Sequence, residues 1–512
     1  MKIWNNIKRK IAERIVRAWY EGGFPLLTGD RGWLPQIVQD ARFDQSFVAR
    51  RELLRKGRYL EMNNGIVQRI LNVSRLYVIG PSMPYVQPSS SDPAWNKRAK
   101  ECWVEWCRTA GINGESMSEL LKVGHDRKRI DGEIFFSTTS IKPAGGQSLP
   151  RIQAIESHRV ETPVDRLADE GSSIFDGLQV NSSGQPQAWW VKKGDSIFTA
   201  QQDYVSIPFS DLIHVFRPTR VNQVRGISDF FSVVNVLNDI YDLQVLEMRA
   251  AKDAAEKSTF IKTASGEIPS DKMRARVLGP NYPGSSTPVE TGPDPLGKRM
   301  DYYRNIIGGR TVGLKLTEDV TQFLPQRPSA GTQWYWRYLT EIVCISIDMP
   351  LCLVFPDGKL SGPELRAALQ IANTAFHAEF AIWRATIQRF WNFYFAWAIR
   401  NDIRVADPPP DWKSLKVYPP RNVTVDVGYD SAAALAELAA GVTDWETLVA
   451  SRGEDCYELF DRLAKQQAYL KDNGVQVILP GAKGTASPED GTPQPAIAPE
   501  PSKPAQPQEI VQ

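Results

Sequence analysis

The chain has 512 residues, of which 42% are hydrophobic and 23% are charged, and its formal net charge is +2. This composition is typical of about three folded globular domains and excludes a mainly disordered, collagen-like or coiled-coil chain. The sequence has no apolar stretch of about 18 residues and no apolar signal segment at its start. Its five cysteines are too few for a disulfide framework. We therefore expect an intracellular protein with reduced thiols and no membrane span.

Charge is unevenly distributed along the chain. Basic side chains outnumber acidic ones in residues 1–60, and acidic side chains outnumber basic ones in residues 426–512. Isoleucine recurs every four residues from Ile3 to Ile15, with Lys and Arg between, which predicts an amphipathic helix over residues 3–20. This basic N-terminal arm could dock onto protein, lie on a membrane surface or touch nucleic acid, and we favour docking onto protein.

The next part of the chain changes from helical to strand patterns. Residues 46–78 predict a helix with a break at Asn63–Gly65, and residues 95–108 predict another helix. Ser116 and Glu119 form a capping box that opens a third helix, which ends near Gly132. Five short β-rich segments follow, at residues 133–139, 152–155, 177–180, 188–191 and 212–216. Residues 181–184 predict a hairpin turn, so residues 1–225 are expected to be α+β.

Two long helical patterns flank a segment of different composition. The pattern at residues 227–257 loses its apolar face toward a charged, Ala-rich end, so we expect this helix to leave its domain core. Residues 258–328 are dense in Gly and Pro yet keep aromatic residues, which indicates a compact insertion. Within the insertion we expect a helix at 296–307 and strands at 311–316 and 321–323. A helix at 333–347 and a loop at 351–360 follow.

A strong start signal then opens a helix that runs to about residue 400. Ser361 is its cap, Pro363 lies in the first turn and Glu364 is at the third position. Its aromatic face favours packing in a core over stacking against nucleic-acid bases. A strand at 423–427 is predicted next.

The C-terminal part is predicted to be helical and then disordered. Helices are expected at residues 431–440, 444–451 and 454–472, and Thr443 and Glu446 form the capping box of the second. After residue 474 the chain is rich in Pro, Ala and Gln and predicts a disordered tail.

A catalytic or metal-binding constellation is hard to find in the sequence. The four histidines and five cysteines lack the spacing of a metal site, and there is no P-loop, nucleophile elbow or dinucleotide fingerprint. Asp126, Asp131 and Glu133 could belong to a metal-dependent nuclease, although acidic residues at a helix-to-strand turn are usually solvated. His214 lies in an apolar strand, where a hydrogen-bonded structural histidine is the favoured interpretation. We expect no metal, no cofactor and no enzyme activity.

One ordered set of segments carries a family resemblance. A strand that ends in His-x-Phe leads into an Arg-rich loop, which closes on Gln-x-Arg-Gly before the long helix. These signature residues are His214, Phe216, Arg217, Arg220, Gln223, Arg225 and Gly226. Further blocks agree at residues 241–257, 347–350, 360–369, 420–425 and 439–455. Over roughly residues 40–475 the set resembles the lambda-type portal proteins of tailed bacteriophages.

The resemblance implies a portal-type α+β subunit with an α/β wing, a two-helix stem, a small α/β clip, a helical crown and the disordered tail. The wing would comprise residues 1–225 and 361–425, and the stem helices residues 226–257 and 330–349. The clip would be residues 258–329, the tunnel loop 350–360, the crown 426–475 and the tail 476–512.

A portal of this kind would form a homo-oligomeric ring, usually of twelve subunits, at one capsid vertex of the virion after assembly in the host cytoplasm. Double-stranded DNA would pass through it, independent of sequence, during packaging and ejection. The terminase large subunit, the major capsid or scaffold protein and head–tail connector proteins would be its partners, and no membrane would be. Six charged residues are candidates for facing the DNA: Arg249, Lys252, Asp253, Glu256, Asp357 and Lys359.

Two alternatives stay open at this point. The chain could be another neck or tail ring protein, or the nucleic-acid enzyme that Asp131 and Glu133 suggest. The stem charges could also pair between neighbouring subunits instead of facing DNA.

Overall fold

The computed structural model describes residues 41, 47–142, 146–163, 174–193, 203–255, 259–263, 311–315, 330–356, 360–424 and 427–473. The described residues up to Glu454 form one compact unit of mixed helix and sheet, and residues after it belong to a second unit. The expected elements at 3–20, 296–307 and 321–323 lie outside the described residues, as does the predicted tail. Within the described residues, none of the helices combines the length and apolar character that a membrane crossing requires.

The first helices begin and end where the sequence signals place them. Helix α3 (Phe47–Asn63) stops before Asn64, whose side-chain oxygen accepts hydrogen bonds from two backbone N–H groups of α4 (Gly65–Val78). Helix α5 (Pro93–Cys107) follows, and α6 (Met117–Asp131) carries the predicted capping box of Ser116 and Glu119. Gly132, with φ of 88°, ends α6 in the left-handed region that suits glycine.

Two antiparallel sheets follow α6. In the first, β2 (Glu133–Ile141) lies between β3 (Leu149–Ile155) and β8 (Leu212–Phe216). The second has the order β4 (Ile174–Phe175), β5 (Leu178–Val180), β6 (Pro186–Lys192) and β7 (Tyr204–Pro208). The predicted turn at residues 181–184 joins β5 to β6. All five predicted strands of this region are confirmed, whereas β4 and β7 were not predicted.

The long helix α12 (Gly362–Asn401) supplies the largest part of the core. Its aromatic side chains are buried against α5, with ring centroids of Trp103 and Trp391 5.2 Å apart and those of Trp95 and Phe395 5.6 Å apart. Burying each of these rings contributes about 3 kcal/mol relative to exposure. The prediction that this face packs in a core is therefore confirmed. A further pair of strands, β1 (Tyr85–Pro88) and β11 (Leu415–Tyr418), was not predicted.

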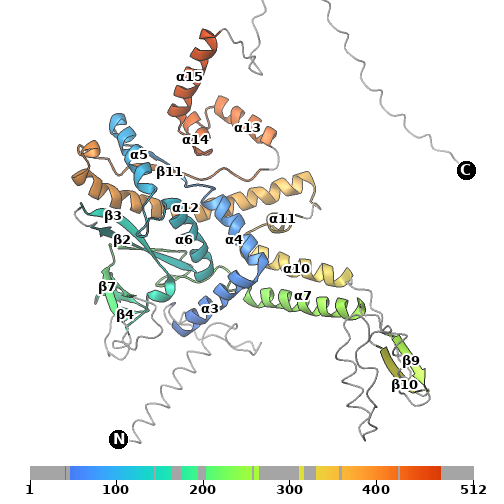
Figure 1. The fold of residues 1–512 in the computed structure, drawn as a ribbon. Coiled ribbons are helices and arrows are strands. Elements are labelled where there is room, and N and C mark those ends of the chain that lie inside the picture. Colours follow the sequence, from blue (N-terminus) through green and yellow to red (C-terminus); the bar gives the residue numbers. More distant parts are fainter. Residues whose placement is uncertain are drawn as a thin grey trace, which may run out of the picture. The chain divides into compact units, whose positions relative to one another are not determined.

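Helices α7 (Val234–Ala255) and α10 (Ala330–Ser346) pack against each other (Figure 1). The chain beyond them forms a two-stranded parallel pair, β9 (Thr259–Thr263) and β10 (Thr311–Lys315). The parallel pair confirms the strand expected at residue 311 and adds one that was not expected.

Four boundaries differ from the predictions. Helix α7 begins at Val234, because residues 230–233 form turns that bury Phe230 and Val233. The expected loop at 351–360 contains a short helix, α11 (Leu351–Val354). The expected strand at 423–427 is wrong in the described residues, because residues 423–424 form no strand and α13 (Val427–Ala439) begins at the last predicted position.

The fourth difference concerns the second predicted capping box. The N-cap of α14 (Trp445–Ala450) is Asp444, whose carboxylate accepts the Thr447 N–H at 2.7 Å, and not Thr443. Aspartate is as good a cap as threonine, so the shift leaves the helix intact. The last helix, α15 (Cys456–Asp472), belongs to the second unit.

Candidate functional site: a buried ion-pair network under the signature loop

The signature residues divide into an inward and an outward group. Strand β8 carries His214, and residues 217–226 lead from it toward α7. Gln223, Arg225 and Gly226 are buried, whereas Arg217 and Arg220 are exposed. The buried group is therefore available for contacts within the fold, and the exposed group for contacts outside it.

A fully buried ion pair lies at the centre of the inward group. Arg225 is 2% exposed and its Nε lies 2.9 Å and 3.1 Å from the two carboxylate oxygens of Glu133, which is 0% exposed. Its Nη2 donates to Glu133 Oε1 at 2.5 Å. Glu133 is the first residue of β2, directly after the glycine that ends α6. The pair therefore fixes the signature loop to the helix-to-strand turn.

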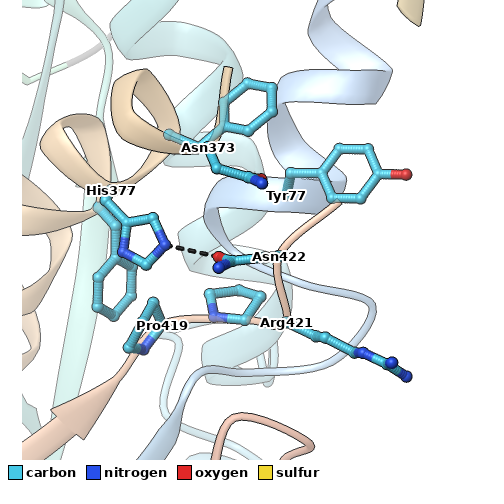
Figure 2. A pocket seen from close by; sticks show the side chains of 9 residues that line it. Tyr77, Asn373, His377, Pro419, Arg421 and Asn422 are labelled. Atoms are coloured by element: carbon cyan, nitrogen blue, oxygen red, sulfur yellow. Dashed lines mark hydrogen bonds between the residues drawn. The ribbon is translucent and has the colours of Figure 1, made fainter. Parts of the chain in front are cut away.

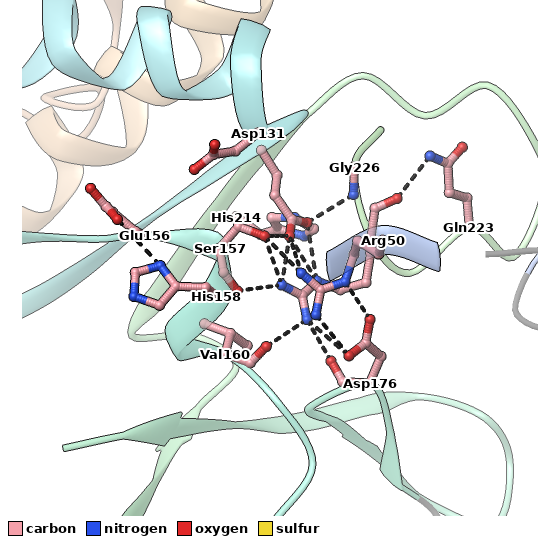
Figure 3. Close-up of polar contacts among 12 residues, drawn as sticks. Arg50, Asp131, Glu156, Ser157, His158, Val160, Asp176, His214, Gln223 and Gly226 are labelled. Carbon is pink, nitrogen blue, oxygen red and sulfur yellow. Dashed lines mark hydrogen bonds and ion pairs between the residues drawn. The ribbon is translucent and has the colours of Figure 1, made fainter. Parts of the chain in front are cut away.

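The same guanidinium also holds the second sheet. Its Nη1 donates to the carbonyl oxygens of Val160 and Asp176, each at 2.7 Å, and its Nη2 donates to the carbonyl of Ser157 at 2.9 Å (Figure 3). Arg225 thus satisfies backbone acceptors from two other segments of the chain. Planar guanidinium suits this role because it offers five donors in a fixed arrangement.

His214 binds the other side of the same carboxylate. Its Nε2 donates to Glu133 Oε2 at 2.8 Å, and its ring stacks on Phe135 at 4.3 Å and on Phe216 at 4.1 Å. Burial lowers the pKa of His214, and the neighbouring Glu133 only partly opposes this. The expected hydrogen-bonded structural histidine is confirmed.

Burial by itself would raise the pKa of Glu133, but the charge of Arg225 and the hydrogen bond from His214 hold that pKa well below its usual range. Glu133 is therefore a carboxylate that only accepts hydrogen bonds. The Ser157 hydroxyl and the Gly226 N–H, at 2.8 Å for the latter, are two further donors to it. With both oxygens engaged, the group is suited to holding structure and not to transferring a proton.

Arg50, on α3, completes the network and was not found from the sequence. Its Nε and Nη2 donate to the Asp176 carboxylate at 2.7 Å and 3.0 Å, and its Nη1 donates to Ser157 Oγ at 3.0 Å. Arg50 is 5% exposed although it lies in a run of basic residues. In the sequence, the position of Arg50 next to Ala49 and three residues before Leu53, both apolar, was the only indication that it faces the core.

Gln223 and Gly226 shape the loop itself. The Gln223 side-chain oxygen accepts the Thr219 N–H at 2.8 Å and the Arg220 N–H at 3.2 Å, and its nitrogen donates to the Arg225 carbonyl at 2.8 Å. A Cβ atom at Gly226 would lie 2.1 Å from the Gly132 carbonyl oxygen, so no larger residue fits there.

The carboxylates of the nuclease hypothesis do not converge. Asp131 pairs with Arg58 at 2.6 Å, Asp126 pairs with Arg75, and Glu133 points into the network. Burial raises the pKa of Asp126 to about 6, against the opposing charge of Arg75. The described part of the chain contains no group of three or more His, Cys, Asp or Glu arranged to hold a metal ion.

The six candidates for facing DNA are only partly visible. Arg249 and Lys252 are exposed on the C-terminal half of α7. Asp253 lies in α7, and its side chain is outside the described residues. Glu256, Asp357 and Lys359 lie outside the described residues.

A shallow pocket lies where residues 419–422 pass α4 and α12 (Figure 2). Its polar side chains already bind one another, with His377 Nε2 2.7 Å from the Asn422 side-chain oxygen. The Asn373 side chain also makes two hydrogen bonds to the backbone of Val423, at 2.9 Å and 3.0 Å. The pocket is thus a seam that anchors the segment leading to α13.

Comparisons with known proteins place these observations in a family. The sequence model of the family described as phage portal protein, lambda family, matches residues 31–374, which is more than half of the chain. The chain is 24% identical over 222 residues to the probable portal protein of Halomonas phage phiHAP-1, covering 41% of this chain and 42% of that one. It is 20% identical to the portal protein of Escherichia phage N15, covering 81% and 84%. The chain therefore spans less than half of the length of the phiHAP-1 protein.

A solved structure is also similar. The chain matches a component of the virion of a native gene transfer agent particle with a TM-score of 0.45 and 11% identity, covering 77% of this chain and 88% of that chain.

Proposed function

Because the chain belongs to the lambda family of phage portal proteins, we propose that its copies close into a ring at one vertex of a phage capsid. Double-stranded DNA passes through the ring during packaging and ejection, and no covalent bond is made or broken by the ring. Terminase docks on it during packaging, connector proteins dock afterwards, and capsid or scaffold protein surrounds it. The family resemblance implies twelve subunits.

The observation that carries the ring proposal is the exposed apolar surface of the two packed helices. On α7, Leu246 is 60% exposed and Met248 is 55% exposed, and on α10 Trp334 is 66% exposed. Trp334 also stacks on Tyr338 at 5.5 Å, and that ring is exposed as well. The stacked rings of Trp334 and Tyr338 form a cluster of exposed apolar surface, which favours a protein interface. Neighbouring copies would cover it in a ring.

The portal divisions follow as part of the same proposal. The wing comprises residues 1–225 and 361–425, the stem is α7 with α10, and the clip is residues 258–329. The tunnel loop is residues 350–360, with α11 at its start, and the crown is residues 426–475. The parallel pair β9–β10 supports this division, because it joins the chain entering the clip to the chain leaving it.

The channel charges are proposed to act through repetition. One Lys359 and one Asp357 per subunit become rings of alternating sign, and Arg249 and Lys252 of α7 add to them or pair with neighbouring subunits. Mixed signs limit how many phosphates are neutralised at once, so the duplex is held by weak, replaceable contacts. Such contacts suit movement that is independent of base sequence.

Electron microscopy of the purified full chain, with symmetry analysis, tests the ring. We expect an annular particle with an axial opening, and a monomer under every assembly condition would refute the proposal. Replacing Lys359 by Ala tests the channel. We expect rings to form normally while packaged or retained DNA falls several-fold, and a map that places residues 357–359 on the outer surface of the ring would contradict this assignment.

A further inference from the structure

The exposed part of the signature loop, residues 217–222, is ordered by hydrogen bonds from the buried side chain of Gln223. Gln223 binds two backbone N–H groups of this loop and the carbonyl of Arg225, which the ion-pair network fixes. Asn222 adopts a φ of 61°, a left-handed conformation that Asn tolerates better than most residues. A loop ordered before binding loses little conformational entropy when it binds, which favours a role in recognition.

The loop presents a basic and apolar surface. Arg217 and Arg220 are exposed, and Val221, which follows Arg220, is 87% exposed. Arg217 has no ion-pair partner within the part of the chain that the structure describes. Arginines beside a protruding valine fit a protein surface that offers carboxylates and an apolar contact. A DNA backbone would use the arginines but offers no apolar contact to the valine.

A surface of matching character lies on the first turns of α7. Asp239 and Asp242 are three residues apart and Asn238 and Asp242 are four apart, so they share a helix face. All three are exposed, and Tyr241 beside them is 53% exposed. Among the described residues, neither aspartate has an ion-pair partner. The patch thus offers two carboxylates next to an exposed aromatic ring.

We propose that the loop of one copy binds the α7 patch of the next copy, with Arg217 facing Asp239 and Asp242 and Val221 against Tyr241. The inference rests on the proposed ring and names part of its contact surface. The two patches differ from each other, so the contact is heterologous, which gives a ring where the rotation between copies closes, as the proposed function requires. The buried network would then act at a distance, because it positions a loop that belongs to the subunit interface.

Charge exchange in the full chain tests the contact. The variant Arg217→Glu should lower the apparent affinity of ring assembly at least tenfold in sedimentation velocity, because it places like charges together. Combining it with Asp242→Arg should restore assembly to within about threefold of the original protein. The matched control is Arg389→Glu, an exposed arginine of α12, which should assemble normally.

A second measurement does not depend on how the charge variant folds. The variant carrying both Val221→Cys and Tyr241→Cys, treated with a short bismaleimide, should give a ladder of covalently linked subunits on a denaturing gel. A variant that carries only one of these two substitutions should give far less. Links formed only within one chain would overturn the proposal.

The failures of the two proposals are distinguishable. If the original protein forms no ring, the proposed function fails and this contact fails with it. If Arg217→Glu assembles as well as the original protein and the cysteine pair gives no ladder, only the contact is overturned. If Arg217→Glu forms normal rings that lose DNA, the loop contacts DNA instead of a neighbouring subunit, and the proposal is again overturned.

Discussion

Replacing Arg225 by Met should destabilise the first sheet by about 5 kcal/mol. The change removes the closest cation from Glu133, which is 0% exposed and keeps only its hydrogen bonds from His214, Ser157 and Gly226 and the more distant Arg50 at 3.9 Å. Breaking a buried pair in this way costs about 3–5 kcal/mol. Three backbone carbonyls that accept from the guanidinium also lose their donor, at about 1 kcal/mol each where water cannot reach them. Together these costs come to about 6–8 kcal/mol. The donors that Glu133 keeps and partial rearrangement of neighbouring groups lower the net loss to about 5 kcal/mol.

Hydrogen exchange measures this loss locally, through the free energy of opening of the amides that join β2 to β8. The control is Arg404→Met, which removes an ion pair with Glu105 at 2.9 Å whose arginine is 47% exposed, and should change the opening free energy by less than about 1 kcal/mol. The double variant Arg225→Met with Glu133→Leu should recover much of the loss, because it removes the stranded charge. An Arg225→Met chain that opens no more readily than the control would refute the reasoning.

Three further outcomes follow from particular residues. Gly226→Ala should prevent the loop from closing, because its Cβ would meet the Gly132 carbonyl at 2.1 Å, and a proteolysis assay should then cut the loop. The hydrogen bond from His158, with help from Arg58 against the effect of burial, lowers the pKa of Glu156 from 4.5 to about 2. The carboxylate therefore stabilises the fold above pH 4.5, and this contribution is lost as the pH falls toward 2. Since Glu156 is 44% exposed, Glu156→Gln should reduce the acid-side loss of unfolding free energy by less than about 1 kcal/mol, measured by denaturant unfolding as a function of pH. Burial raises the pKa of the Cys102 thiol to about 11, so about one molecule in a thousand is thiolate at pH 8, and iodoacetamide should spare it until the chain is denatured. Rapid labelling of native Cys102 would contradict this.

Local signals in the sequence were sufficient for helix ends and tight turns. Asn64, the capping box at Ser116 and the start of α12 were predicted because cap and helix lie within four residues of each other. Strand β1 was missed because it has only four residues and ends in Pro88, and its partner β11 lies more than 300 residues away. Pairings of that separation leave no local pattern.

The candidate site was predictable only in part. The signature identified His214 and Arg225, and the apolar strand around His214 favoured a structural role, as found. The sequence could not show which signature residues turn inward, because that depends on the partners Glu133, Arg50 and Asp176 from distant segments. The carboxylate of Glu133, considered as a metal ligand, is instead the acceptor at the centre of the network.

The parallel pairing of β9 with β10 has a consequence for how the chain is made. Unlike a hairpin, parallel strands cannot form from neighbouring residues, and here roughly 50 residues separate Thr263 from Thr311. At about 5–20 residues per second, a ribosome exposes β9 for roughly 3–10 s before β10 has been synthesised. During that interval β9 has an unsatisfied edge, so nascent chains on one polysome are at risk of pairing with one another, and slower translation lengthens the risk.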